Sequence, residues 1–292
     1  MKFFLTGANG FVGKNFIKFF QKKHEINHYS RGNKIDIDED VVIHFAGKAH
    51  DTKNSSNSNE YYSSNTELTK NIFDSFLESN SRIFIMLSSV KAVADTVEGV
   101  LTEDNIPNPK THYGMSKLLA EKYIFSKKNL KNKRIYILRP CMIHGPGNKG
   151  NLNILYKFVS KGIPWPLGSF SNSRSYCSIE NLLFIINEII NNKRIPSGIY
   201  NVADDLPLST NKIIFLMRNT LKINHSTWNI PKILVKILAY IGDIFPIPLN
   251  SERLKKLTES YIVSNRKIVK LMRKNLPLSS EEGIIKTLKS FN

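Results

Sequence analysis

The sequence is poor in cysteine and in acidic residues, and both shortages narrow the class of protein. Among 292 residues there are two cysteines, Cys141 and Cys177, too few for a disulfide framework and not at a metal-binding spacing. We therefore expect a reduced, cytoplasmic environment and no metal site. Met1 leads directly into an apolar segment, without the basic and hydrophobic regions of a secretory leader, so secretion is not expected.

Acidic residues are outnumbered by basic ones, 24 against 42, which gives a net charge of +18. Such an excess is compatible with nucleic acids, anionic membranes or phosphorylated substrates as partners. The lysines are scattered among asparagines rather than clustered with aromatic residues, so the pattern favours a solvated basic surface and no nucleic-acid partner. The length and the hydrophobic content of 41% allow a large core in one or two domains.

A strand, a glycine-rich turn and a helix are predicted at the start of the chain. Residues 2–6 are apolar, glycines stand at positions 7, 10 and 13, and a helical run follows from residue 14 to 21. This spacing allows a tight turn and a close approach of the backbone to a diphosphate, at which the helix N-terminus directs its free N–H groups. The residues predicted to bind a dinucleotide here are Gly7, Asn9, Gly10, Phe11, Val12 and Gly13.

The second predicted strand, residues 25–29, bears on the choice of cofactor. An NAD site would have an acidic residue after this strand to bind the ribose 2′-hydroxyl. Ser30 and Arg31 occupy that place instead, and a guanidinium can bind a 2′-phosphate. The sequence therefore slightly favours NADP and leaves NAD open.

Two further segments are expected to be strands of the same sheet. Residues 35–37 would form a short third strand with Asp36 near the adenine, although the chain that follows is too short for a crossover helix. Residues 41–47 read as a buried strand that ends in small residues, as expected beside a cofactor. The residues predicted to contact the cofactor there are Phe45, Ala46 and Gly47.

A tyrosine and a lysine four residues apart open a predicted helix after the proline-containing loop 105–109. One helical turn brings Tyr113 and Lys117 onto one face, where the ammonium is expected to lower the pKa of the phenol. Tyr123 and Lys127 have the same spacing, but they lie within the helix, where packing is the expected role. Tyr113 is therefore the predicted acid/base, acting on an alcohol or ketone.

Another predicted strand, residues 82–87, is followed by Ser88 and Ser89. The carboxyl ends of strands in open α/β sheets bind ligands, so these hydroxyl groups are candidates for binding a substrate oxygen beside Tyr113. Strands at 133–138 and 199–202 complete the predicted sheet, the second by returning to it.

These elements predict an α/β fold, with a Rossmann-type doubly wound parallel sheet and a smaller, mostly helical C-terminal substrate domain. We assign residues 1–160, with 199–203, to the dinucleotide-binding domain, and 161–292 to the substrate-binding cap. One cap helix, residues 231–245, is apolar apart from a narrow stripe that includes Lys232, Lys236 and Asp243. It is too polar to span a bilayer, and its pattern favours internal packing over an interfacial membrane helix.

Together, these motifs resemble the extended short-chain dehydrogenase/reductases of the NAD-dependent epimerase/dehydratase family, in the branch of nucleotide-sugar 4-epimerases and 4-keto-sugar reductases. The resemblance covers about residues 7–274. It rests on the glycine turn, Ser88-Ser89, Tyr113-x-x-x-Lys117, Arg139-Pro140, Gly145-Pro146-Gly147 and Arg174.

The resemblance implies a role for each matching residue. Tyr113 is the acid/base, Lys117 lowers its pKa and holds the nicotinamide ribose, and Ser89 shares the substrate oxygen. Asn65 completes the catalytic tetrad, and Pro140 lies beside the nicotinamide. The implied substrate-binding residues are Ser88, Ser89, Asn151, Arg174 and Arg253, of which Arg174 contacts the nucleotide diphosphate.

One departure from the family narrows the reaction. Val90 and Lys91 stand where dehydratases carry an acidic pair, so elimination of water is not expected. The resemblance implies redox chemistry at C4 of a UDP-linked hexose or N-acetylhexosamine, for surface polysaccharide precursors, in a homodimer. The run 148–151 with Arg174 resembles a subgroup acting on N-acetylhexosamines.

Three alternatives remain open. The first is an NADPH-dependent reductase of a UDP-4-keto-6-deoxy-N-acetylhexosamine. The second is a 4-epimerase of a polyprenyl-diphosphate-linked N-acetylhexosamine, which would act in peripheral contact with the membrane. The third is a non-catalytic NADP-sensing module, which would not need Ser89, Tyr113 and Lys117 together.

Overall fold

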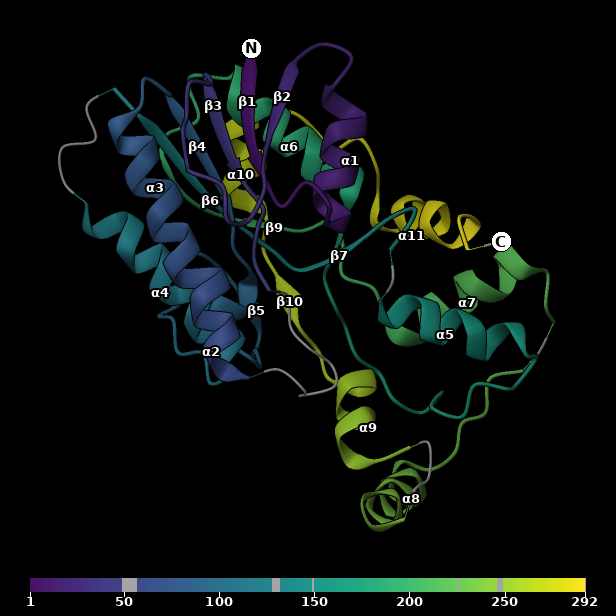
Figure 1. Cartoon of the computed structure of the whole chain (residues 1–292). Coiled ribbons are helices and arrows are strands. Elements are labelled where there is room, and N and C mark those ends of the chain that lie inside the picture. Colours follow the sequence, from purple (N-terminus) through teal and green to yellow (C-terminus); the bar gives the residue numbers. More distant parts are fainter. Residues whose placement is uncertain (49–56, 128–131, 149, 225, 246–248, 292) are drawn as a thin grey trace.

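A six-stranded parallel sheet lies at the centre of the computed structural model, which describes residues 1–48, 57–127, 132–148, 150–224, 226–245 and 249–291 (Figure 1). Its strand order is β2-β1-β3-β4-β6-β9, and every adjacent pair is parallel. Because β2 and β3 lie on opposite sides of β1, the chain changes direction there, which creates the crevice where such sheets bind ligands. The strands are β1 (Lys2–Thr6), β2 (Glu25–Tyr29), β3 (Val41–His44), β4 (Ile83–Leu87), β6 (Arg134–Pro140) and β9 (Gly198–Val202).

Helices cover both faces of the sheet. Successive side chains of a strand point to opposite faces, and in these strands the side chains on both faces are apolar. Phe3 and Leu5 of β1 belong to the core under one face, and Phe4 belongs to the core under the other. The first face carries α1 (Phe11–Phe20), α6 (Ile179–Asn191) and α10 (Arg266–Met272). The second carries α3 (Leu68–Glu78) and α4 (His112–Ser126), with α2 (Ser58–Tyr61) and the π-helical turn η1 (Tyr62–Glu67) before α3 (Figure 1). The predicted doubly wound fold is confirmed.

The predicted third strand at residues 35–37 is wrong. This segment is irregular, with Ile37 buried and Asp36 exposed. It follows β2, which is the edge strand of the sheet, and it pairs with no strand of the described chain. The connection from β2 to β3 contains no helix, in agreement with the short length of chain available.

The remaining helices form a second layer beyond the carboxyl ends of the strands (Figure 1). A separate hydrophobic cluster, with Tyr156, Trp165 and Met217 among its members, holds this cap together. The packing places α5 (Asn151–Ser160) in the cap cluster and α6 against the sheet. The domain boundary at residue 160 stays a prediction. The cap helices are α5 (Asn151–Ser160), α7 (Thr210–Leu221), α8 (Lys232–Ile244), α9 (Ser251–Thr258) and α11 (Ser280–Lys289).

Short parallel strand pairs link the two parts. β5 (Val100–Leu101) pairs with β10 (Ile262–Val263), and β7 (Met142–His144) pairs with β8 (Tyr176–Ser178). One cap prediction fails: α8 is not packed inside the protein, because only Val235 and Ala239 of its residues are buried.

Candidate active site

The glycine turn lies between β1 and α1, at the crevice beside β1. Gly7 has a φ of +76°, and a Cβ there would lie 2.6 Å from the backbone nitrogen of Ala46. A Cβ on Gly13 would overlap the carbonyl oxygen of Gly7, so both positions require glycine. Gly10 is the exposed N-cap of α1 and has no side chain, which leaves the first N–H groups of α1 open to an anion. These features fit a dinucleotide diphosphate.

The polar residues after β2 lie next to this turn. Tyr29 pairs with Thr6 in the parallel register, so Ser30 and Arg31 follow directly beside the turn. Arg31 is exposed, and its guanidinium donates a hydrogen bond of 3.0 Å to the hydroxyl of Ser64. This is a suitable position for a cation that would bind a ribose 2′-phosphate.

Tyr113 lies in the first turn of α4, which packs closely on the segment after Ser89. Thr111 caps α4 by accepting a hydrogen bond of 3.2 Å from the backbone N–H of Gly114. A Cβ on Gly114 would overlap the carbonyl oxygen of Lys91, so glycine permits this approach. The Ser89 hydroxyl is hydrogen-bonded to the phenol of Tyr113, so the two groups lie close together.

The pKa of Tyr113 differs from the prediction. Burial of the phenol raises its pKa, and the hydrogen bond with Ser89 only partly opposes this. Lys117 is itself buried, and its ammonium donates a hydrogen bond of 3.0 Å to the carbonyl oxygen of Leu87. Burial lowers the pKa of Lys117 to about 8, against the opposing charge of Glu121. In this structure desolvation, rather than the neighbouring ammonium, thus dominates the pKa of the phenol.

Asn65 lies in the π-helical turn η1 and is fully buried. Its side-chain oxygen accepts a hydrogen bond of 2.8 Å from the Lys48 N–H, and its side-chain nitrogen donates one of 3.0 Å to the Ser116 hydroxyl. A Cβ on Gly47 would lie 2.6 Å from the Asn65 oxygen and 2.9 Å from the Lys117 nitrogen. The end of β3, η1 and α4 therefore converge at Gly47, and π-helical turns often occur at functional sites.

Sequence reasoning missed a buried chain of hydrogen bonds beneath these residues. The Ala46 N–H donates to the Thr6 hydroxyl at 3.1 Å, which in turn lies 2.7 Å from Nδ1 of His44. Nε2 of His44 lies 2.8 Å from the hydroxyl of Thr69, which donates at 2.7 Å to the Asn65 carbonyl. Burial lowers the pKa of His44 to about 3, so its ring is neutral.

The donors and acceptors in this series of hydrogen bonds can be assigned from Thr69. Since the Thr69 hydroxyl donates to Asn65, it accepts from His44, whose ring proton is therefore on Nε2. This series of hydrogen bonds joins the turn after β3 to η1. Thr6 and His44 are paired in the register of β1 and β3, which no spacing along the sequence reveals.

The predicted role of Ser88 in substrate binding is not supported by its contacts. Its hydroxyl donates to Glu121 at 2.5 Å, and Glu121 also forms a buried ion pair with Arg139, at 2.5–3.2 Å. The hydroxyl proton of Ser88 is thus directed into the protein. Binding of the substrate by Ser88 stays a prediction, in which its oxygen could only accept a hydrogen bond.

The other predicted substrate residues lie in or beside the cap. Arg174 donates a hydrogen bond to the carbonyl oxygen of Lys256 in α9, the helix that also carries exposed Arg253. The two arginines, far apart in the sequence, are thus associated with one helix. Asn151 is exposed at the start of α5, whereas Lys149 lies outside the described residues.

Two other predicted positions are placed as follows. Pro140 ends β6, where it pairs with Val202 of β9. The Lys91 ammonium lies 4.3 Å from the centre of the Tyr261 ring and donates to the Asp95 carbonyl oxygen, and burial lowers its pKa. A cation, rather than an acid, therefore follows Ser89.

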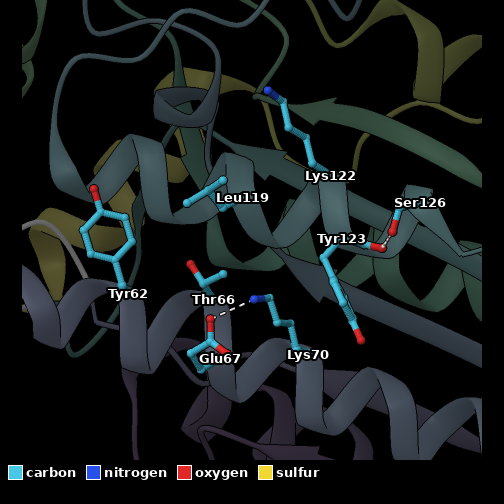
Figure 2. Close-up of a pocket in the computed structure, with 8 residues that line it drawn as sticks. All are labelled: Tyr62, Thr66, Glu67, Lys70, Leu119, Lys122, Tyr123 and Ser126. Carbon is cyan, nitrogen blue, oxygen red and sulfur yellow. Dashed lines mark hydrogen bonds and ion pairs between the residues drawn. The ribbon is translucent and has the colours of Figure 1, made fainter.

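A surface hollow lies between α4 on one side and η1 with the start of α3 on the other (Figure 2). Its α4 residues, at positions 119, 122, 123 and 126, face away from positions 113 and 117 when each residue turns the helix by about 100°. The hydroxyl of Tyr123 donates to Asp74 at 2.5 Å. The second Tyr-x-x-x-Lys match therefore has a structural partner on the far side of α4.

Comparisons with known proteins agree with this geometry. The model of the "NAD dependent epimerase/dehydratase family" matches residues 3–203. The chain is 30% identical over 322 residues to the UDP-glucose 4-epimerase of Vibrio cholerae, an alignment that covers 98% of this chain and 94% of that protein.

Two solved structures share the fold. UDP-glucuronic acid 4-epimerase from Bacillus cereus, in complex with NAD, matches with a TM-score of 0.78 and 18% identity, over 100% of this chain and 98% of that one. RMD from Pseudomonas aeruginosa, complexed with NADPH, matches with a TM-score of 0.75 and 17% identity, over 99% and 98%. With the family model matched over most of its length, this chain is an enzyme of the NAD dependent epimerase/dehydratase family, of the extended short-chain dehydrogenase/reductase type.

Proposed function

We propose that the enzyme inverts C4 of a UDP-linked hexose or N-acetylhexosamine, through a 4-keto intermediate, in the synthesis of surface polysaccharide precursors. The observation that carries this proposal is the grouping of Ser89 with Tyr113, and of Lys117 with Asn65, at the carboxyl edge of β3 and β4. Similar proteins named for 4-epimerisation of UDP-glucose and of UDP-glucuronic acid support it.

The proposed mechanism is proton transfer by Tyr113. A nicotinamide cofactor held by the glycine turn, Tyr113 and Lys117 would supply reversible hydride transfer at C4, on either face of the 4-keto sugar. Tyr113 removes the proton of the 4-hydroxyl and gives it back to the same oxygen, to which Ser89 also hydrogen-bonds. Lys117, with a pKa of about 8, is mostly protonated near neutral pH, so its charge favours the phenolate.

We propose that the cofactor is NADP or NAD, with NADP slightly favoured. The glycine turn fits the diphosphate, and Arg31 beside it is the candidate ligand for a 2′-phosphate. Arg31→Ala should weaken NADPH binding by about tenfold, in line with the loss of one charge-assisted contact, and leave NADH binding unchanged. Fluorescence titration with both cofactors measures this, and an unchanged preference would remove Arg31 from the proposed site.

The reaction can be tested by NMR of UDP-GlcNAc, UDP-GalNAc and a UDP-4-keto-6-deoxyhexosamine, with and without added NADPH. Interconversion of the first two without added cofactor is the expected result. Stoichiometric consumption of NADPH with the keto sugar would instead identify the alternative, a net reductase that uses the same residues.

Two matched variants test the assignment of the acid/base. Tyr113→Phe should abolish activity, because it removes the only proposed proton carrier. Tyr123→Phe removes the hydroxyl of the second Tyr-x-x-x-Lys match, which bonds Asp74, and should retain activity. Full activity of Tyr113→Phe, or equal loss in both variants, would contradict the mechanism.

A lipid-linked sugar is the second candidate substrate, favoured by the exposed apolar helix α8. If the enzyme converts a polyprenyl-diphosphate-linked N-acetylhexosamine in detergent but does not convert UDP-GlcNAc, the lipid-linked sugar is the substrate. A non-catalytic NADP-sensing role predicts no conversion of either substrate. The cytoplasmic location stays a prediction.

We also propose a homodimer through α3 and α4. Leu119 and Phe125 of α4 are 45% and 50% exposed, and Leu119 lines the hollow in Figure 2. Large apolar side chains that stay exposed are candidates for a protein interface. Sedimentation velocity should show a dimer that Leu119→Glu dissociates, and a monomeric wild type would refute the proposal.

A further inference from the structure

Helix α8 presents its short side chains to the protein and its long apolar ones to solvent. Val235 and Ala239 are each 1% exposed, and a Cβ on Gly242 would overlap the carbonyl oxygen of Leu249. These three positions form one face of the helix. A surface helix of a globular protein normally does the reverse and buries its largest apolar residues.

The outward face is continuous and apolar. Its members are 36–72% exposed and recur at helical spacing: Ile233, Leu234, Ile237, Leu238, Ile241 and Ile244. Single exposed apolar residues are common on protein surfaces, but a contiguous patch of large ones marks an interaction site. The face is also fixed in place, because Asp243 accepts a hydrogen bond of 2.9 Å from the Ser251 N–H at the start of α9.

Exposed aromatic residues and basic residues lie on α8 or close to it in the sequence. Trp228 and Tyr240 are 52% and 67% exposed, and such amphipathic aromatic residues favour the headgroup level of a bilayer. Between residues 231 and 259 the sequence has five basic side chains against three acidic ones, within a chain of net charge +18. Anionic headgroups complement that charge.

A second copy of the chain fits this face less well. A helix of 13 residues is about 20 Å long and, with side chains, about 10 Å wide, so one face presents a few hundred Å² at most. A stable protein interface buries about 800 Å² per partner. A bilayer has no such minimum, since each inserted side chain adds its own contribution.

We propose that α8 is a membrane-binding helix that lies in the interface of an anionic bilayer, with its isoleucines inserted among the acyl chains. No helix in the described ranges is long and apolar enough to cross a membrane. α8 lies at the end of the cap remote from the sheet, where a bilayer can reach it without contacting the sheet (Figure 1). The proposal goes beyond the C4 chemistry and does not depend on it.

Flotation of the full chain with vesicles tests the proposal. The protein should bind vesicles of phosphatidylglycerol and phosphatidylcholine at a ratio of about 1:2, and bind pure phosphatidylcholine at least about fivefold less. Ile237→Glu should reduce binding to the anionic vesicles at least about tenfold, because it places a charge among the acyl chains. Lys236→Ala should reduce it about fivefold.

Phe19→Glu is the matched control. Phe19 is 50% exposed, close to the 51% of Ile237, but it lies on α1, against the sheet. The control should bind vesicles as the wild type does, and both variants should retain wild-type sugar conversion without vesicles. A loss of flotation is thus separable from a failure of the proposed function.

Three results would overturn the inference. The first is no binding of the wild type to anionic vesicles. The second is equal binding by Ile237→Glu and the wild type. The third is a dimer in sedimentation velocity that Ile237→Glu dissociates while vesicles do not bind, which would assign this face to a second copy.

Discussion

Replacing Lys117 with methionine should stabilise the folded enzyme and abolish its activity. Lys117 is 5% exposed, and burial lowers its pKa from the ordinary 10.5 to about 8. Since one pKa unit corresponds to about 1.36 kcal/mol, the buried ammonium costs about 3 kcal/mol at neutral pH. Methionine has a similar length and no charge, so this cost disappears.

Loss of a hydrogen bond offsets part of the gain. The ammonium donates to the Leu87 carbonyl oxygen at 3.0 Å, a bond that contributes about 1 kcal/mol. The expected net stabilisation of Lys117→Met is therefore about 2 kcal/mol at neutral pH. Activity is lost because the charge that favours the Tyr113 phenolate is removed.

The sign of the pH dependence follows from the lowered pKa. Between pH values of about 8 and 10.5 the unfolded chain holds the Lys117 proton and the folded chain does not, so the wild type gains stability as pH rises. Lys117→Met lacks this gain. The stability advantage of Lys117→Met should be full below about pH 8 and be lost by about pH 10.5.

Urea unfolding followed by tryptophan fluorescence, at about pH 7 and about pH 10, measures this difference. Lys122→Met, an exposed position on the same helix, is the control and should show no pH-dependent difference from the wild type. A Lys117→Met protein that is less stable than the wild type at neutral pH would refute the reasoning. So would a difference that does not change with pH.

Three further variants test the polar interactions in and around the site. Ser89→Ala should raise the pKa of Tyr113 further, since it removes the hydrogen bond that lowers it; the rising limb of the pH–rate profile, which reports formation of the phenolate, should move to higher pH, with activity reduced about 100-fold. Arg139→Met should lower the free energy of unfolding in urea by about 3–5 kcal/mol, because Glu121 keeps its buried charge, and adding Glu121→Gln should restore most of it. His44→Gln should reduce the loss of stability on acidification. In the wild type the pKa of His44 is about 3 when folded, so below about pH 6.5 the unfolded chain binds the proton first and the folded state loses stability as pH falls. Unchanged acid unfolding, or a double variant as unstable as Arg139→Met, would contradict these two expectations.

Features that depend on a few neighbouring residues were predictable from the sequence. The positive φ of Gly7 and the close packing of Gly13 on the Gly7 carbonyl oxygen are local backbone geometry, and the alternation of Phe3, Phe4 and Leu5 between two cores follows from the strand period of two. The return of residues 199–202 to the sheet was likewise predicted and is seen as β9. Such patterns are set by backbone dihedral angles and need no distant partner.

The tertiary structure decided whatever depends on a partner far away in the chain. Residues 35–37 have a strand-like sequence but pair with no strand of the described chain, and the Ser88 hydroxyl points inward because Glu121, 33 residues later, accepts its hydrogen bond. The contact of Gly47 with Asn65 and Lys117 likewise joins three separate elements. Spacing along the chain determines the face of a helix or strand on which a side chain lies. Only tertiary packing determines what that face contacts. Packing therefore decides which polar groups share a site and which apolar side chains stay exposed.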